Sequence, residues 1–188
     1  MIDEQFITVE AFWELLNAPE YTDKRLELVY GEVIEMSKPG GKHGVITGNL
    51  FGHIWTLVRQ QRLGYVTAAE TGYILERRSD GRDLVRGLDI GFVRLERAPD
   101  GLPDGFVPFA PDLAVEVISS GNSASDIHNK VLELLRAGTA LIWIVYPDSH
   151  TVTVYTAHGA RILTIEDTLD GSDVLPGFTL PLRTLFEG

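Results

Sequence analysis

The fold is decided by the stretch Ala110-Pro-Asp-Leu-Ala-Val-Glu-Val-Ile-Ser-Ser120 and by the later run Ala140-Leu-Ile-Trp-Ile-Val-Tyr146. The second run is continuously apolar and lies between a glycine and a proline, which is typical of a strand buried on both faces. Between the two, Ser123-Ala-Ser-Asp126 has a capping-box pattern with Asp in place of the usual Glu, and it predicts a helix from about Ser125 to Ala137. The sequence therefore predicts a strand–helix–strand crossover.

Upstream residues add strands to the same sheet. A helix is expected from about His43 to Arg62, ended by Gly64, and strands are expected over Tyr65 to Leu75, Leu84 to Arg94 and Leu113 to Ser119. Consecutive strands followed by a crossover indicate an α/β (α+β) fold with a mixed central sheet flanked by helices.

Further elements are expected at both ends of the chain. Residues 1–188 have the length of one domain, and we expect a single one. Before the sheet we expect a short helix capped by Thr8 and a hairpin over Arg25 to Met36 that turns at Tyr30-Gly31. A connecting loop is expected over Ala98 to Pro111. After the sheet we expect a hairpin of Thr151 to Tyr155 with Ala160 to Ile165, and then a mostly irregular C-terminal stretch with Pro176, Gly177 and Pro181.

Composition excludes several classes of protein. The sequence contains no cysteine, so disulfides, thiolate zinc sites and a cysteine nucleophile are ruled out. The net charge of -11 argues against a tight non-specific nucleic-acid coat protein, because such binding depends on neutralising phosphates. No apolar run approaches the roughly 20 residues that span a membrane, and the acidic start lacks the pattern of a secretory signal. We expect a soluble cytoplasmic protein.

Two acids stand out because they lie inside apolar strands. Asp89 lies in Val85 to Val93, and Glu116 lies between β-forming residues. A carboxylate in such a place is costly unless it is paired or binds metal. Each acid alone could instead face solvent or pair with an arginine such as Arg86 or Arg94. On neighbouring strands, however, the two could converge on one hard cation, and Mg²⁺ prefers one or two carboxylates with water and phosphate.

Three more residues are candidates for the same site. Lys130 falls at the edge of the apolar stripe of the helix that follows Glu116, where it could reach back to the carboxylates or pair with Asp126 one turn earlier. His43 lies on the apolar face of its helix, where a capping or core role is the alternative. Glu27 alternates with two leucines, which places it on the outer face of the hairpin unless it closes over the site.

Other catalytic patterns are incomplete. Gly121-Asn-Ser-Ala-Ser125 lacks the second glycine of a nucleophile elbow, and Met36 stands where a phosphate-binding loop ending at Gly41-Lys42 would need its first glycine.

An ordered set of motifs covers nearly the whole chain, from about residue 5 to residue 186. The motifs are Arg25-Leu-Glu-Leu-Val-Tyr-Gly-Glu32, His43, the stretch 110–120, Asp126-x-x-x-Lys130, Leu134-Leu-Arg-Ala-Gly138 and Ile142-Trp-Ile-Val-Tyr-Pro147. Together they resemble the Uma family of restriction-endonuclease-like proteins, within the PD-(D/E)XK superfamily.

The resemblance implies the superfamily core and a two-carboxylate Mg²⁺ site. By position, Asp89 matches the Asp of the PD motif and Glu116 matches the acid of the (D/E)XK motif. Leu88 replaces the usual proline, and Ile118 stands where the lysine belongs. The second departure is common in this family, whose lysine comes from the following helix, and Lys130 is at that position.

The leading hypothesis is a Mg²⁺-dependent endonuclease that hydrolyses phosphodiester bonds in DNA, with Mn²⁺ as a possible substitute. Asp89 and Glu116 would hold the metal, with the Val117 carbonyl as a further ligand, and Lys130 would position the nucleophile. His43 and Glu27 are accessory residues. The alternative is a catalytically inactive or partner-dependent module on a nuclease fold, motivated by the acidic charge. A homodimer is expected, as for many nucleases that cut both strands.

Overall fold

The computed structural model describes residues 6–119 and 121–187, so the first half of the acidic start and Ser120 lie outside the described residues. The chain begins with helix α1 (Val9–Leu16), and the Thr8 hydroxyl accepts a hydrogen bond from the Ala11 amide. The predicted hairpin is confirmed as β1 (Arg25–Val29) and β2 (Glu32–Met36). Its turn residues Tyr30 and Gly31 have φ of 52° and 83°, as a tight two-residue hairpin requires.

Helix α2 (Gly41–Gln61) is the longest helix of the described chain. Its apolar face is buried, as the spacing predicts. The helix ends close to Arg62, as predicted, but the role given to Gly64 in ending it was wrong. Arg62 takes the left-handed conformation that ends the helix, with φ of 55°. Gly64 begins the next strand, where a Cβ would lie 2.0 Å from the carbonyl oxygen of Val93. The glycine therefore permits close strand contact.

The central sheet is mixed, as predicted. Strands β3 (Gly64–Glu76) and β4 (Leu84–Arg94) pair antiparallel, and β5 (Leu113–Val117) pairs antiparallel with β4. Helix α3 (Ala124–Arg136) then crosses over to β6 (Leu141–Tyr146), which is parallel to β5. The Ser123 hydroxyl accepts from the Asp126 amide, which confirms the helix cap; the Asp126 carboxylate accepts from that hydroxyl, so the reciprocal backbone bond of a full capping box is absent from the described residues. The sheet order is β2-β1-β4-β5-β6-β7-β8, with β3 also on β4; β7 is Thr151–Thr156 and β8 is Gly159–Leu163.

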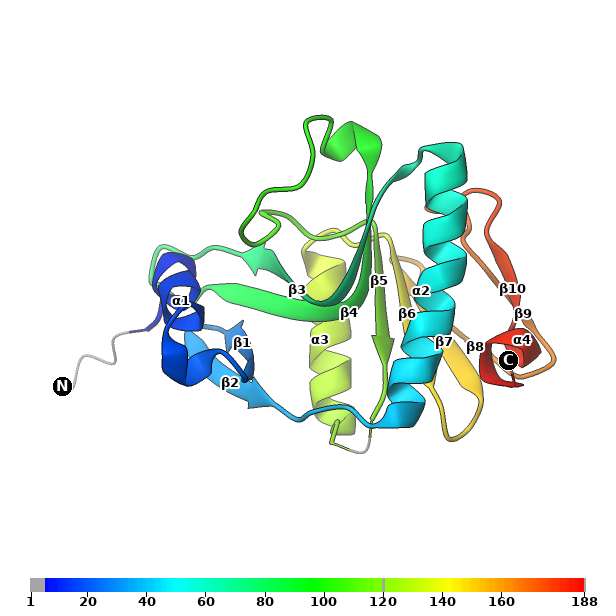
Figure 1. Ribbon diagram of the computed structural model, residues 1–188, viewed down its shortest axis with the longest axis horizontal. Helices are drawn as coiled ribbons and strands as arrows, with labels where there is room; N and C mark the ends of the chain where they lie inside the picture. Colours follow the sequence, from blue (N-terminus) through cyan, green and yellow to red (C-terminus); the bar gives the residue numbers. More distant parts are fainter. Residues whose placement is uncertain (1–5, 120, 188) are drawn as a thin grey trace.

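Helices α2 and α3 lie against the central sheet (Figure 1), and two apolar clusters join them to it. One joins α2 to the sheet through residues such as Leu50, Val115 and Trp143. The other joins α3 to the sheet through Ala114, Leu134 and similar residues. Alternate residues of β5 therefore face opposite layers, as period-2 geometry requires.

The prediction of a mostly irregular C-terminal stretch was incomplete. A small two-stranded sheet of β9 (Thr168–Asp170) and β10 (Thr179–Pro181) precedes helix α4 (Leu182–Glu187). Buried leucines in these segments join the α2-side cluster, which orders them despite the prolines and glycines. Short 3-10 helices occupy Pro19–Tyr21 and Leu95–Arg97. Within the described residues, we find no helix whose length and apolar character would let it cross a membrane.

Candidate active site

Strand register brings the two predicted acids together. Ile90 of β4 is opposite Val115 of β5 in an antiparallel pair. The next position along each strand is therefore Asp89 beside Glu116. Both line a small polar cavity of about 30 Å³, close to the volume share of one water molecule. His43, Lys130 and Glu27 line the same cavity, so all of the predicted site residues meet there.

Asp89 is held in place by hydrogen bonds to one of its oxygens. Its side chain is 5% exposed, and Oδ2 accepts from the Val117 amide at 2.8 Å. His43 Nε2 lies 3.1 Å from the same oxygen. The alternative pairing of Asp89 with a nearby arginine was wrong, because Arg86 binds Glu27 and Glu133, and Arg94 donates to the Asp173 carbonyl. Within the described chain, no hydrogen bond involves Asp89 Oδ1.

Glu116 is a buried carboxyl with an unusual pKa. Burial raises its pKa to about 7; Lys130 opposes this, while the charges of Asp89 and Glu27 add to it. Lys130 Nζ lies 2.9 Å from Oε1 as an ion pair. This oxygen is buried and nevertheless lacks a partner in hydrogen-bond geometry within the described residues. The Lys130 ammonium is therefore the cation that this oxygen contacts within the described residues.

Lys130 lies in the site, and the alternative of an ordinary surface lysine was wrong. The predicted pair with Asp126 is absent from the described residues, because Asp126 bonds to Ser123 instead. Lys130 donates to the Gly87 carbonyl at 2.7 Å and to Glu27 Oε1 at 3.1 Å. Burial lowers its pKa, but Glu116 and Glu27 raise it above its ordinary value. The ammonium is therefore a fixed cation facing the carboxylates.

Glu27 is buried, so its expected position on the solvent face of the hairpin was wrong. Its carboxylate accepts from Lys130, from Arg86 and from the Gly87 amide. Burial raises its pKa, but Lys130 and Arg86 lower it below its ordinary value. Arg86 also binds the buried Glu133. This chain of charges ties β1, β4 and α3 together beneath the cavity and holds Lys130.

Arg25 and Glu70 were missed by the sequence reasoning. They form an ion pair and both line the cavity. Arg25 Nε is buried without a hydrogen-bond partner in the described residues, while its Nη1 donates to the Ser37 carbonyl. Glu70 has φ of 70° and lies in an irregularity of β3 between Ala68 and Thr71. Bulges often redirect side chains beside active sites. No signal at Glu70 in the sequence marks this bulge.

Comparisons with known proteins agree with this geometry. The sequence model of the Uma2 family, described as "Putative restriction endonuclease", matches residues 9–183. The chain belongs to the Uma2 family. A crystal structure from Anabaena variabilis, described as a "putative nuclease belonging to DUF820", superposes with a TM-score of 0.78. It is 23% identical, and the match covers 96% of this chain and 98% of that chain. No functionally curated protein matches the chain.

The Uma2 site fits a hard divalent cation. Among the described residues, no cluster of three or more His, Asp or Glu side chains has the arrangement of a complete metal site. Mg²⁺, however, needs only one or two carboxylates, because water and substrate phosphate supply its other ligands. Asp89 Oδ1, which accepts no hydrogen bond within the described residues, and the Glu116 carboxylate are the candidate ligands at the cavity. Val117 also lines it, and the role of its carbonyl stays a prediction.

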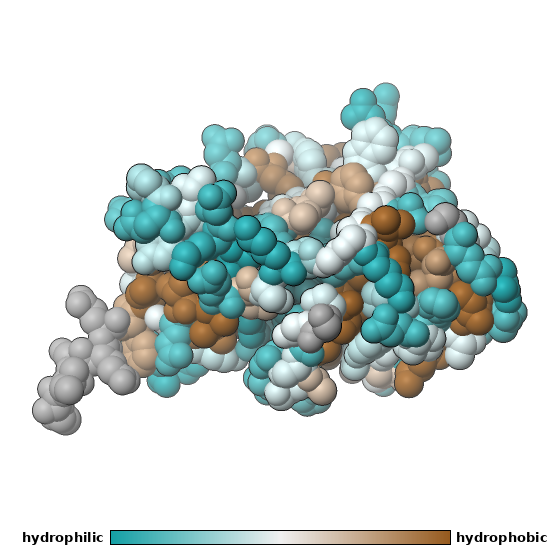
Figure 2. Space-filling model, turned by 60° about the horizontal axis from the view of Figure 1, so that its bottom comes forward, coloured by the Kyte–Doolittle hydropathy of each residue, from teal (hydrophilic) through white to brown (hydrophobic). Residues whose placement is uncertain are grey.

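The face around the cavity is mixed in character. Figure 2 turns the lower side of Figure 1 forward, where β5 ends and α3 begins, and shows hydrophilic residues with separate apolar patches. The site is thus a polar cavity in a nuclease-like fold, lined by four acids, Glu27, Glu70, Asp89 and Glu116, and by the cations Arg25 and Lys130.

Proposed function

We propose that this Uma2 protein is a divalent-metal-dependent endonuclease that hydrolyses phosphodiester bonds in DNA. The observation that carries the proposal is the convergence of Asp89, Glu116 and Lys130 in one polar cavity, with Asp89 Oδ1 free of hydrogen bonds within the described residues. The charge of Asp89 adds to the raised pKa of Glu116, and Lys130 offsets this only in part. Two neighbouring carboxylates whose charges are incompletely compensated support a cation site.

Asp89 and Glu116 would hold Mg²⁺ or Mn²⁺, with the Val117 carbonyl as a further ligand. The cation supplies positive charge for the scissile phosphate and lowers the pKa of water. His43 and the Val117 amide orient Asp89 through the oxygen that they contact, which leaves Oδ1 free. Glu27 and the Gly87 carbonyl orient the Lys130 ammonium toward Glu116. With Glu116 bound to the cation, the N–H of Lys130 that now faces Glu116 would orient the attacking water and stabilise charge developing on phosphate.

Arg25 is proposed to contact the DNA backbone at the mouth of the cavity. Its guanidinium lines the cavity and is restrained by Glu70 and the Ser37 carbonyl. An arginine of this kind suits phosphate, because its fork of donors matches the phosphate oxygens. It gives a local positive group within a chain of net charge -11.

Plasmid and single-stranded DNA incubated with Mg²⁺, Mn²⁺ or chelator test the proposal. The expected result is metal-dependent cutting that is lost in the Asp89→Ala/Glu116→Ala double variant. A matched control is Glu20→Ala/Asp100→Ala, which removes the same charge from exposed positions. Cutting that persists in the first double variant would refute the assignment of the site.

The second candidate is a binding or regulatory module without catalysis, and the strongly acidic charge favours it. Titration calorimetry with Mg²⁺ and Mn²⁺ separates the two candidates. Binding that disappears in Glu116→Ala counts against the module. Absence of metal binding, together with intact folding, counts against the enzyme.

A single domain spanning residues 1–188, a homodimer and a cytoplasmic location remain parts of the proposal. Light scattering at high protein concentration tests the dimer, and a monomer there would remove it.

A further inference from the structure

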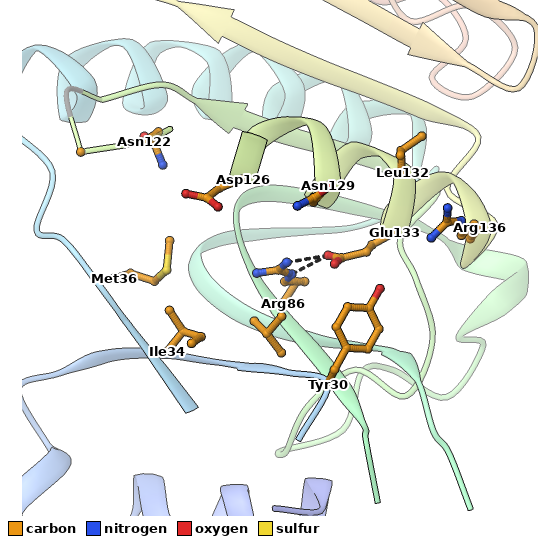
Figure 3. A pocket seen from close by; sticks show the side chains of 12 residues that line it. Tyr30, Ile34, Met36, Arg86, Asn122, Asp126, Asn129, Leu132, Glu133 and Arg136 are labelled. Atoms are coloured by element: carbon orange, nitrogen blue, oxygen red, sulfur yellow. Dashed lines mark hydrogen bonds and ion pairs between the residues drawn. The ribbon is translucent and has the colours of Figure 1, made fainter. Parts of the chain in front are cut away.

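A larger cavity of about 510 Å³ lies between α3 and the β1–β2 hairpin, next to the catalytic cavity (Figure 3). Its size is within the range of small-molecule sites. The proposed catalytic roles do not use it, except that Arg86 at its base also binds Glu27. Its walls come from the hairpin, from β4, from α3 and from the turn before α3.

The walls differ in chemistry. Ile34 and Met36 from the hairpin form an apolar side, and Ile34 is 40% exposed. Asp126 and Asn129 point from α3 toward the space opposite them, and Asn122 lies at one end (Figure 3). A planar ligand could therefore contact apolar side chains with its face and hydrogen-bond to amides and a carboxylate with its edge.

The charges in this cavity do not suit a phosphate. Arg86 already binds two carboxylates, those of Glu27 and Glu133, at 2.7 Å each. Figure 3 shows its pair with Glu133 at the base of the cavity. The lining also carries exposed Asp126 in the first turn of α3 and exposed Arg136 in its last turn, and no ion pair joins them within the described residues. Anion sites present unpaired cations or amides, whereas the buried cation of this cavity, Arg86, is already compensated and the first turn of α3 presents an acid. A neutral ligand with polar edges fits better.

The cavity adjoins the catalytic cavity. Met36 and Asn122 line both. Arg86 and Asp126 also line a small space beside Lys130, whose walls include residues of both cavities. If the phosphate of one nucleotide lies at Asp89 and Glu116, the base of the adjacent nucleotide would therefore be directed toward the hairpin–α3 cavity.

We propose that this cavity binds an unpaired nucleobase of the strand being cut. The inference rests on the proposed function and deepens it, because it names unpaired DNA as the substrate class. A base inside a duplex cannot enter such a cavity without leaving its stack. Single strands and unpaired nucleotides should accordingly be preferred over intact duplex.

Fluorescence anisotropy with labelled oligonucleotides in chelator tests the proposal without cleavage. The probes are a single-stranded thymidine oligonucleotide and an abasic oligonucleotide of the same length. The wild-type protein should bind the probe with bases about tenfold more tightly, as base contacts in single-strand sites do. Asn129→Ala should lower this ratio about fivefold, the value of one hydrogen bond. His128→Ala, an exposed change on the same helix but outside the cavity lining, should leave it unchanged.

Ile34→Ser provides a second test from the opposite wall, at an exposed position where misfolding is not expected. Equal binding of both probes, no binding of either, or a ratio unaffected by Asn129→Ala and Ile34→Ser would each overturn the inference. Base-dependent binding without metal-dependent cutting would keep the cavity assignment and refute the nuclease. Metal-dependent cutting without base-dependent binding would keep the nuclease and refute the cavity assignment.

Discussion

Replacing Glu116 with glutamine should make the free protein more stable at pH 8. Burial raises the pKa of Glu116 from an ordinary 4.5 to about 7. One pKa unit corresponds to about 1.4 kcal/mol, so ionised Glu116 destabilises the fold by about 3 kcal/mol. Glutamine removes this cost, and Lys130 keeps Glu27 and the Gly87 carbonyl as partners. For a domain of this size the melting temperature should rise by roughly 6–12 °C.

The pH dependence has a definite sign. Below pH 4.5 the carboxyl is protonated in both the folded and unfolded states, so the variant should show no gain of this origin. Between pH 4.5 and about 7 only the unfolded state ionises, which lowers the stability of the wild type as pH rises. Above about pH 7 the gain should be constant.

Thermal unfolding in chelator across pH 4 to 9 measures this gain. Glu20→Gln, at an exposed position, is the matched control and should be neutral at every pH. An equal or lower melting temperature for Glu116→Gln at pH 8 would refute the reasoning, because Lys130 would then stabilise Glu116 more than burial costs. Saturating Mg²⁺ should reverse the order, since only the wild type retains its metal ligand.

Three further outcomes follow from the same contacts. Mn²⁺ affinity measured by calorimetry should fall about tenfold per pH unit below about pH 7, because protons compete for Glu116; a flat profile from pH 5 to 8 would exclude it as a ligand. Lys130→Ala should abolish cutting and cost about 3–5 kcal/mol in urea unfolding, because it leaves Glu27 and Glu116 without their shared cation; unchanged stability would contradict the buried pairing. Glu70→Gln should tighten single-stranded DNA binding at low salt by freeing Arg25, and an equal affinity would show that the pair does not restrain this arginine.

Most of the fold could be predicted from local patterns. Apolar runs bounded by glycine and proline identify β5 and β6, and the Ser123–Asp126 cap identifies α3. Asp89 and Glu116 could be predicted because a carboxylate within an apolar strand has few explanations other than pairing or metal. These signals lie within one element each.

The errors concern contacts between distant elements. Alternation assigned Glu27 to the opposite face from its leucine neighbours, but it could not show that α3 and Arg86 cover that face. Lys130 contacts Gly87, 43 residues away, rather than Asp126 on its own helix. The position of Glu70 depends on an irregularity of β3, and the requirement for glycine at position 64 comes from a close carbonyl of the neighbouring strand. None of these partners is close in the sequence.

The position of Lys130 on α3 has a consequence for β5. In the usual motif, the lysine follows the acid by two residues and occupies the strand itself. Here that place belongs to Ile118, which packs against the α3-side cluster while its amide bonds to Val145 of β6. Ile118 thus packs between the sheet and α3, whereas Lys130, 14 positions after Glu116, contributes the positive charge. The ammonium thus reaches Glu116 from the neighbouring helix and not from the strand that carries the acid. A structural search that uses the coordinates of the charged atoms would therefore find relatives that a search for a sequence motif of fixed spacing would miss.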